Sequence, residues 1–144
     1  MAGVSVRVVV AEDEALIRLD LVEMLAEAGY EVVGQAATGE AAVELVGRVR
    51  PDVALLDIRM PVMDGLAAAQ AILAEHRCAV VMLTAFSDRD LVARARDAGV
   101  AGYLVKPVAP GDLVPAIELA LARFSELTAL QQDVAALEGK LATR

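Results

Sequence analysis

The sequence predicts an α/β fold, a doubly wound five-stranded parallel sheet with an extended C-terminal helix. Two observations predict it. Apolar runs rich in Val, Ile and Leu recur along the chain, and segments of helical period separate them. Strands made of unbroken apolar residues are typical of parallel sheets covered on both faces. With 144 residues, 58% of them hydrophobic, the chain can bury a sizeable core and is too apolar to be disordered.

The apolar runs and the helical segments alternate regularly along the chain. This alternation predicts βαβ units with right-handed crossovers. The strands are predicted near 6–11, 31–36, 52–57, 79–84 and 101–105, and the first four helices at 14–28, 39–49, 65–75 and 88–98.

Several helix ends carry local signals. Gly29 and Gly99 follow the first and fourth helices and are typical C-terminal stops. Ser87, with Asp90 three residues later, forms a capping-box pattern that predicts the start of the fourth helix.

The last helix is predicted to begin near Asp112, with Pro115 in its first turn. Beyond Phe124 an apolar seam with spacings of 3 and 4 indicates a short heptad pattern. Its members are Leu127, Leu130, Val134, Leu137 and Leu141. We therefore divide the chain into a domain at 1–123 and a helical or coiled-coil extension at 124–144. A helix folded back on the domain is the alternative; we favour one that projects and pairs with a second copy or connects to an output module.

Composition excludes several classes of protein. The net charge is −8 and the basic residues are scattered, which disfavours direct binding of DNA or RNA by this chain. No apolar run is long enough to cross a membrane, and no signal-peptide pattern is present, so we expect a cytoplasmic protein. Single Cys78 excludes an internal disulfide and is expected to be buried. His76, the only histidine, is expected to be a surface residue rather than a phosphoryl donor.

Polar side chains close four of the predicted strands. Glu12 and Asp13 follow the first, Asp57 closes the third, Thr84 the fourth and Lys106 the fifth. Open α/β sheets bind ligands at the carboxyl ends of their strands, so these groups should meet at one edge. Each has a simpler interpretation when taken alone: a helix cap for the first pair, a turn for Thr84 or Asp57, a solvated Lys106. Their coincidence favours a shared site.

The chemistry of this set suits a divalent cation and a phosphoryl group. Mg²⁺ (or Mn²⁺) prefers carboxylate and carbonyl oxygens, here those of Glu12, Asp13 and Asp57 and the backbone carbonyl of Arg59. Asp57 can act as the nucleophile that forms an aspartyl phosphate. The ammonium of Lys106 would neutralise charge on the phosphoryl oxygens.

Four motifs together resemble the receiver domain of two-component response regulators, over about residues 5–123. They are Val-Ala-Glu-Asp-Glu at 10–14, Leu-Leu-Asp-Ile-Arg-Met-Pro-Val-Met-Asp-Gly at 55–65, Leu-Thr-Ala at 83–85 and Tyr-Leu-Val-Lys-Pro at 103–107.

The resemblance implies the flavodoxin-like strand order 2-1-3-4-5 and makes Asp57 the phospho-acceptor. It implies a Mg²⁺ pocket of Glu12, Asp13 and Asp57. Thr84 and Lys106 would respond to the phosphoryl group, and Thr84 would act with Tyr103 as the switch.

The same resemblance implies a cis bond between Lys106 and Pro107, and a turn at Gly65 into the third helix. The donor would be a sensor histidine kinase, docking near Leu16, Ile17 and the loop 108–111.

A finer resemblance, at 11–21 and 112–124, is to ANTAR-type transcription-antitermination regulators. In these the receiver and a helix precede a small RNA-binding domain. We expect this chain to be a truncated form of such a regulator or a naturally stand-alone receiver, with RNA binding left to a C-terminal domain that it lacks.

Three functional hypotheses remain: a phosphorylation switch, a phosphatase of the aspartyl-phosphate type, or a scaffold receiver that takes no phosphate. Phosphatases of that type generally need a second acid two residues after the nucleophile, where this chain has Arg59. We therefore expect a regulatory domain that catalyses only its own phosphorylation and dephosphorylation. The Arg59 side chain is expected to shield the phosphoryl group or to pair with Glu12 or Glu14, with a solvated surface arginine as the alternative.

Overall fold

The computed structural model describes residues 5–75, 78–85 and 88–142, and within them strands and helices alternate as predicted. The strands are β1 (Arg7–Ala11), β2 (Glu31–Ala36), β3 (Val53–Asp57), β4 (Ala79–Thr84) and β5 (Gly102–Val105). The helices are α1 (Ala15–Glu27), α2 (Gly39–Val49), α3 (Gly65–Ala74), α4 (Arg89–Asp97) and α5 (Pro110–Ala142). Predicted and observed boundaries agree to within two residues.

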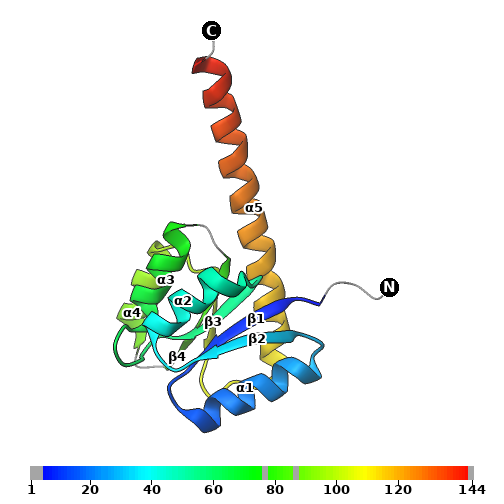
Figure 1. Cartoon of the computed structure of the whole chain (residues 1–144), viewed down its shortest axis with the longest axis vertical. Coiled ribbons are helices and arrows are strands. Elements are labelled where there is room, and N and C mark those ends of the chain that lie inside the picture. Colours follow the sequence, from blue (N-terminus) through cyan, green and yellow to red (C-terminus); the bar gives the residue numbers. More distant parts are fainter. Residues whose placement is uncertain (1–4, 76–77, 86–87, 143–144) are drawn as a thin grey trace.

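All strand pairs are parallel, and the sheet order is β2-β1-β3-β4-β5, which confirms the predicted topology. Helices α1 and α5 cover one face, and α2, α3 and α4 cover the other (Figure 1). Alternate residues of one strand therefore enter different cores: Val8 and Val10 pack toward α1 and α5, and Val9 toward α2 and α3. Burial on both faces explains why the central strands are apolar throughout.

Glycines end two helices as predicted. Gly29 follows α1 with φ of 92°, and Gly99 follows α4 with φ of 100°, both in the left-handed region that Gly adopts without steric cost. Asp88 occupies the N-cap position of α4 but makes no side-chain cap hydrogen bond there. His76, and Ser87 of the predicted capping box, lie outside the described residues.

The loop between β3 and α3 is held tightly against the end of β3. A Cβ atom on Gly65 would collide with the backbone carbonyl oxygen of Asp57. The Gly65 N–H also donates to the Ile58 carbonyl at 3.0 Å. Gly65 is therefore required by this close approach of two backbone segments, and its φ is not positive as the turn interpretation would suggest. This contact fixes the backbone that carries Asp57.

Helix α5 begins two residues earlier than predicted. Pro110 occupies the first position, where the missing N–H of proline costs little. Pro115 consequently lies inside the helix rather than in its first turn. It cannot donate the helical hydrogen bond back to Gly111, which weakens the start of α5. The predicted start near Asp112, with Pro115 in the first turn, is therefore corrected to Pro110.

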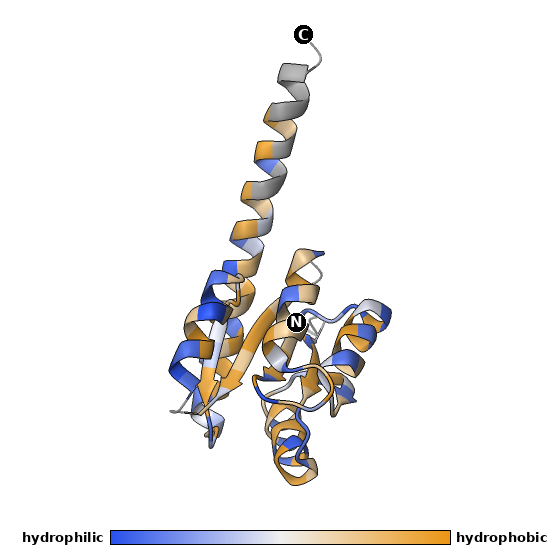
Figure 2. Ribbon diagram, turned by 90° about the vertical axis from the view of Figure 1, so that its left-hand side faces the viewer, coloured by the Kyte–Doolittle hydropathy of each residue, from blue (hydrophilic) through white to orange (hydrophobic). Residues whose placement is uncertain are grey.

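The C-terminal part of α5 projects away from the domain (Figure 1). Leu113, Ile117 and Ala120 are fully buried against the sheet, whereas the described seam side chains beyond Phe124 are exposed. The exposed fractions are 45% for Leu127, 61% for Leu130, 52% for Val134 and 61% for Leu137. Apolar bands recur along this free segment (Figure 2). The helix thus projects, as favoured, and does not fold back.

The side chain of Leu141, the last residue of the seam, lies outside the described part. Across the described residues, no helix combines the length and apolarity needed to span a bilayer.

The two glycines Gly65 and Gly111 predict opposite effects of the same substitution. Gly65→Ala should lower the free energy of unfolding by about 1–3 kcal/mol or more, because the methyl group collides with backbone. Gly111→Ala should raise it by about 0.5–1 kcal/mol, because open space surrounds this helical position. Urea unfolding of both variants checks the pair, and equal effects would contradict the role given to Gly65.

Candidate functional site

The carboxyl ends of the strands bring the predicted site residues together. The Lys106 ammonium donates hydrogen bonds to Asp57 Oδ2 at 2.6 Å and to Glu12 Oε1 at 2.7 Å. Ligand oxygens of Glu12, Asp13 and Asp57 all lie within 4.8 Å of one another. These groups come from β1, β3 and β5, as the topology required. The peptide bond between Lys106 and Pro107 is cis, as the resemblance implied.

These side chains open into a cleft of about 260 Å³ at the edge of the sheet. Glu12 and Asp57 are buried beneath it, and Asp13 is exposed at its rim. The cleft is lined by Asp13, Glu14, Asp57, Arg59, Ala85, Asp88 and Lys106. The Asp57 carboxylate is therefore sheltered, yet it lines a cleft at the surface.

The buried charges shift one another's pKa values. Burial, together with the neighbouring Asp57 carboxylate, raises the pKa of Glu12 to about 7. Burial alone would lower the pKa of Lys106, but its hydrogen bonds to Asp57 and Glu12 raise it. Lys106 is therefore protonated at neutral pH, and Glu12 holds its proton far more tightly than an exposed glutamate.

The three carboxylates fit a hard divalent cation. Such an ion prefers oxygen ligands and would stabilise the charged form of Glu12, which burial and the neighbouring Asp57 disfavour. When bound, it would neutralise negative charge on an incoming phosphoryl group. The contribution of the Arg59 backbone carbonyl stays a prediction.

The capping interpretation of Glu12 is not confirmed, because Glu14 is the N-cap of α1 and no side chain caps this helix. Its Oε2 accepts the backbone N–H of Glu14 at 3.3 Å, just before α1 begins. Its backbone carbonyl accepts a hydrogen bond from Arg18 at 2.6 Å. Glu12 thus belongs both to the site and to the start of α1, which limits the freedom of its side chain.

The two predicted switch residues, Thr84 and Tyr103, lie on the neighbouring strands β4 and β5. Thr84 is buried, and its hydroxyl donates to the Leu104 carbonyl at 3.4 Å, a long hydrogen bond. Tyr103 is half-buried, and its hydroxyl donates to the Val92 carbonyl of α4 at 3.5 Å. Both hydrogen bonds lie at the outer limit of hydrogen-bond distance and therefore oppose a rearrangement only weakly.

The Arg59 side chain lies differently from what the sequence indicated. Its Nε donates to Asp88 Oδ1 at 2.7 Å, so the predicted ion pair with Glu12 or Glu14 is wrong. Asp88 is a site residue that sequence reasoning missed, because its position just before α4 suggested only a helix start. The only feature of the sequence that could have indicated Asp88 as a site residue is that a charged side chain follows Thr84 by four positions.

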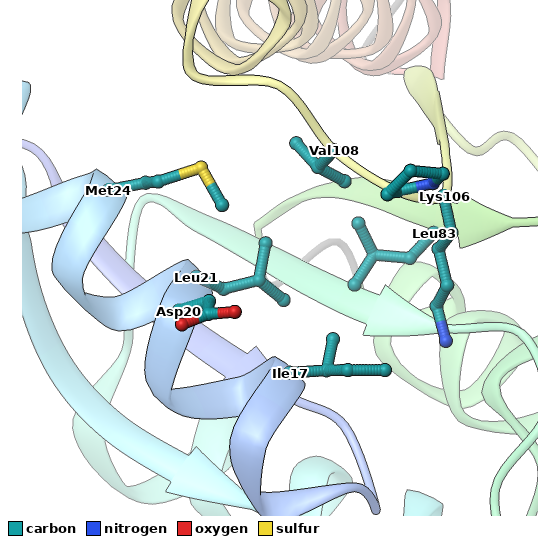
Figure 3. Close-up of a pocket in the computed structure, with 8 residues that line it drawn as sticks. Ile17, Asp20, Leu21, Met24, Leu83, Lys106 and Val108 are labelled. Atoms are coloured by element: carbon teal, nitrogen blue, oxygen red, sulfur yellow. The ribbon is translucent and has the colours of Figure 1, made fainter.

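A second, more apolar cleft of about 280 Å³ lies on the other side of Lys106, between α1 and the stretch after β5 (Figure 3). Ile17, Leu21, Met24 and Val108 point toward it. Leu16 and Leu19, also on α1, are 79% and 51% exposed. An apolar surface therefore adjoins the cleft that holds Asp57.

The fold and the carboxylate-lysine site define a regulatory domain of the response regulator class. The family model for the response regulator receiver domain matches residues 8–118, so the chain belongs to this family, which acts in phosphorylation-dependent two-component signalling.

Among curated relatives, the chain is 56% identical to the transcriptional regulatory protein PdtaR of Mycobacterium tuberculosis, over 99% of this chain and 70% of that protein. It is 34% identical to the chemotaxis protein CheY of Thermotoga maritima, over 77% of this chain and 93% of that protein.

Solved structures show the same fold. The receiver domain of a modulated diguanylate cyclase from Desulfovibrio desulfuricans G20 has a TM-score of 0.78 and 32% identity, covering 85% of this chain and 98% of that one. The response regulator domain of Thermotoga maritima CheB has a TM-score of 0.76 and 26% identity, covering 83% and 98%. These similarities confirm the predicted family and fold.

The raised pKa of Glu12 predicts a pH-dependent affinity for Mg²⁺. Below about pH 7 the cation must displace the Glu12 proton, so its affinity should fall by up to about tenfold per pH unit. Calorimetric titration with Mg²⁺ between pH 6 and 8 measures this slope, and Glu12→Gln should flatten it. If Glu12→Gln kept the same dependence of Mg²⁺ affinity on pH, Glu12 would not be the group that titrates.

Proposed function

We propose that Asp57 accepts a phosphoryl group from a sensor histidine kinase, and that α5 relays the change to an output. The main support is the contact of the Lys106 ammonium with Asp57 at 2.6 Å, within a cluster of carboxylates that suits Mg²⁺ or Mn²⁺. A nucleophile, a fixed positive charge and a cation pocket are the parts that phosphoryl transfer needs.

The residues of this chain take distinct roles in the transfer. An Asp57 carboxylate oxygen attacks phosphorus in line with the leaving group, and the bond from phosphorus to the donor breaks. Lys106, already within hydrogen-bond distance of Asp57, neutralises charge that develops on the equatorial oxygens. Glu12 and Asp13, with Asp57, would hold the cation, and Glu12 also accepts a hydrogen bond from Lys106 that keeps the amine in place.

The phosphoryl group then biases a two-state element. The Thr84 hydroxyl exchanges its long bond to Leu104 for a phosphoryl oxygen, and Tyr103 moves inward into the space released. Tyr103 lies on β5, next to α5, so the change reaches the surface made by α4, β5 and α5.

The output is transcription antitermination, exerted by an RNA-binding domain coupled to α5. Support comes from the 56% identity to a transcriptional regulatory protein. The chain itself is a poor nucleic-acid surface, because its net charge is −8.

The domain catalyses only its own phosphorylation and dephosphorylation. Arg59 occupies the position where an aspartyl-phosphate phosphatase generally carries its second acid, and it is engaged with Asp88. A scaffold that takes no phosphate is disfavoured by the intact contacts of Lys106.

Incubation with Mg²⁺ and a small acyl phosphate should add one phosphoryl group, visible by intact mass. Asp57→Ala should abolish the adduct, and Lys106→Ala should slow its formation because the fixed positive charge is lost. Rapid hydrolysis of excess donor would instead support the phosphatase, and the absence of any adduct from acyl phosphate or kinase would support the scaffold.

The protein donor should require the apolar cleft beside α1. Ile17→Glu places a charge in that cleft, about one helical turn from Leu21, and should slow transfer from the kinase. Labelling by acyl phosphate should be unchanged, because the small donor reaches Asp57 through the other cleft. Equal losses with both donors would place the defect in folding or chemistry instead.

We further propose that α5 pairs with α5 of a second copy. Leu130→Asp combined with Leu137→Asp puts charges on the exposed seam and should shift a concentration-dependent dimer to monomer. The matched control, Ala129→Asp with Ala136→Asp, adds the same charges on the opposite side of the helix and should leave the mass unchanged. Light scattering over a concentration series measures both, with and without phosphorylation. A monomer for the wild type at all concentrations would end the pairing idea.

A further inference from the structure

Asp88 is a buried carboxylate with two strong partners at the edge of the phosphorylation cleft. Its side chain is 2% exposed. Oδ2 accepts the backbone N–H of Ala85 at 2.8 Å, and Oδ1 accepts the Arg59 Nε–H at 2.7 Å. Ala85 directly follows the switch residue Thr84, and Asp88 directly precedes α4. One carboxylate therefore ties the end of β4 to the start of α4.

The charge on Asp88 depends on these partners. Burial by itself would raise the pKa of Asp88, but the Ala85 N–H and the Arg59 guanidinium lower it. A buried carboxylate that loses its cation is destabilised, because the low-dielectric surroundings no longer offset the cost of desolvation. The Ala85 N–H and Arg59 together therefore stabilise this buried charge, and Arg59 is the cation that pairs with it.

Arg59 also belongs to the acceptor loop. It lies two residues after Asp57, and its backbone N–H donates to Asp57 Oδ1 at 3.2 Å. Asp57, Arg59 and Asp88 line the same cleft. The Arg59 side chain is 66% exposed, and guanidinium has four N–H groups besides Nε–H. It can thus turn from Asp88 toward Asp57 with little loss of packing.

We propose that Arg59 exchanges partners on phosphorylation, leaving Asp88 for an oxygen of the phosphoryl group on Asp57. This inference rests on the proposed acceptor role of Asp57. A phosphoryl group carries more negative charge than a carboxylate and binds guanidinium through paired hydrogen bonds. Asp88 is then a positioning residue that competes with the phosphoryl group for the Arg59 guanidinium.

The exchange gives phosphorylation a route to α4 that is separate from Tyr103. When Arg59 leaves, Asp88 keeps its charge but loses its cation, which destabilises the present position of the start of α4. Thermodynamic linkage is reciprocal. If the phosphoryl group weakens the Arg59–Asp88 ion pair by some factor, the ion pair weakens the binding of the phosphoryl group by the same factor. Neutralising Asp88 should therefore favour the phosphorylated form.

The test measures the affinity for beryllofluoride, a phosphoryl mimic, by calorimetry in the presence of Mg²⁺. Asp88→Asn keeps an oxygen for the Ala85 N–H and should raise the affinity by about five- to tenfold, within the usual range of allosteric coupling. Arg59→Gln should lower the affinity. In the Arg59→Gln background, Asp88→Asn should have no effect. Asp64→Asn is the matched control, since it removes an equal charge from the N-cap of α3, and should change nothing.

A second measurement follows Arg59 directly. The nuclear magnetic resonance signal of its Nε–H, identified by its loss in Arg59→Lys, should shift when beryllofluoride binds the wild type. In Asp88→Asn the signal should already be displaced before the mimic is added.

Two results would overturn the inference while leaving the proposed function intact. In the first, Asp88→Asn changes the affinity for beryllofluoride equally in the wild-type and Arg59→Gln backgrounds, or does not change it in either. The other is an Arg59 signal that does not move when the wild type binds the mimic. Failure of the wild type to bind beryllofluoride, together with no adduct on Asp57, would overturn the proposed function and this inference with it.

Discussion

The contact of one ammonium group with two buried carboxylates is the interaction on which the site depends. Lys106 reaches Glu12 from β1 and Asp57 from β3, and so joins three strands at one edge. Without the amine, two buried carboxylates would face each other uncompensated, which is costly in a low-dielectric environment. Burial, and after it the neighbouring Asp57 carboxylate, raises the pKa of Glu12 to about 7 even with Lys106 present. A bound cation would offset both effects, because it stabilises the charged form of Glu12.

The apolar core offsets the cost of this buried charge, because the central strands β3 and β4 are buried along their full length. Strand β3 is buried along its full length and delivers Asp57 to the edge, while Gly65 brings the following loop directly against the Asp57 carbonyl. Asp57 is thus held by backbone contacts on its C-terminal side and by Lys106 on its side chain. Under the proposed function, a phosphoryl group on Asp57 would act on its less constrained neighbours: Thr84 makes only a long hydrogen bond, and the Arg59 side chain is 66% exposed.

Most of the fold and the core of the site followed from the sequence, for a physical reason. A strand buried on both faces must be apolar, and the residue after its end must lie at the sheet edge, so Asp57 and Lys106 could be placed together from position alone. The Arg59–Asp88 pair could not, because it joins residues 29 positions apart through irregular segments that carry no periodicity. The start of α5 was missed by two residues because both Pro110 and Pro115 are compatible with a first turn, and only tertiary packing decides between them.

The two halves of α5 differ in how firmly they are held, and this difference suits a relay. The domain half is anchored by buried side chains, by the hydrogen bond from Tyr30 to Glu118 at 2.9 Å and by that from Arg123 to the Ala101 carbonyl at 3.2 Å. Burial and the Glu118 carboxylate raise the pKa of Tyr30 to about 12, so the phenol stays a donor at neutral pH. Beyond Phe124 the same helix carries an exposed apolar seam. Because the helix is continuous, a small rotation of the anchored half beside β5 would turn the whole seam. The free half would transmit this rotation although its own described side chains make no contact with the site.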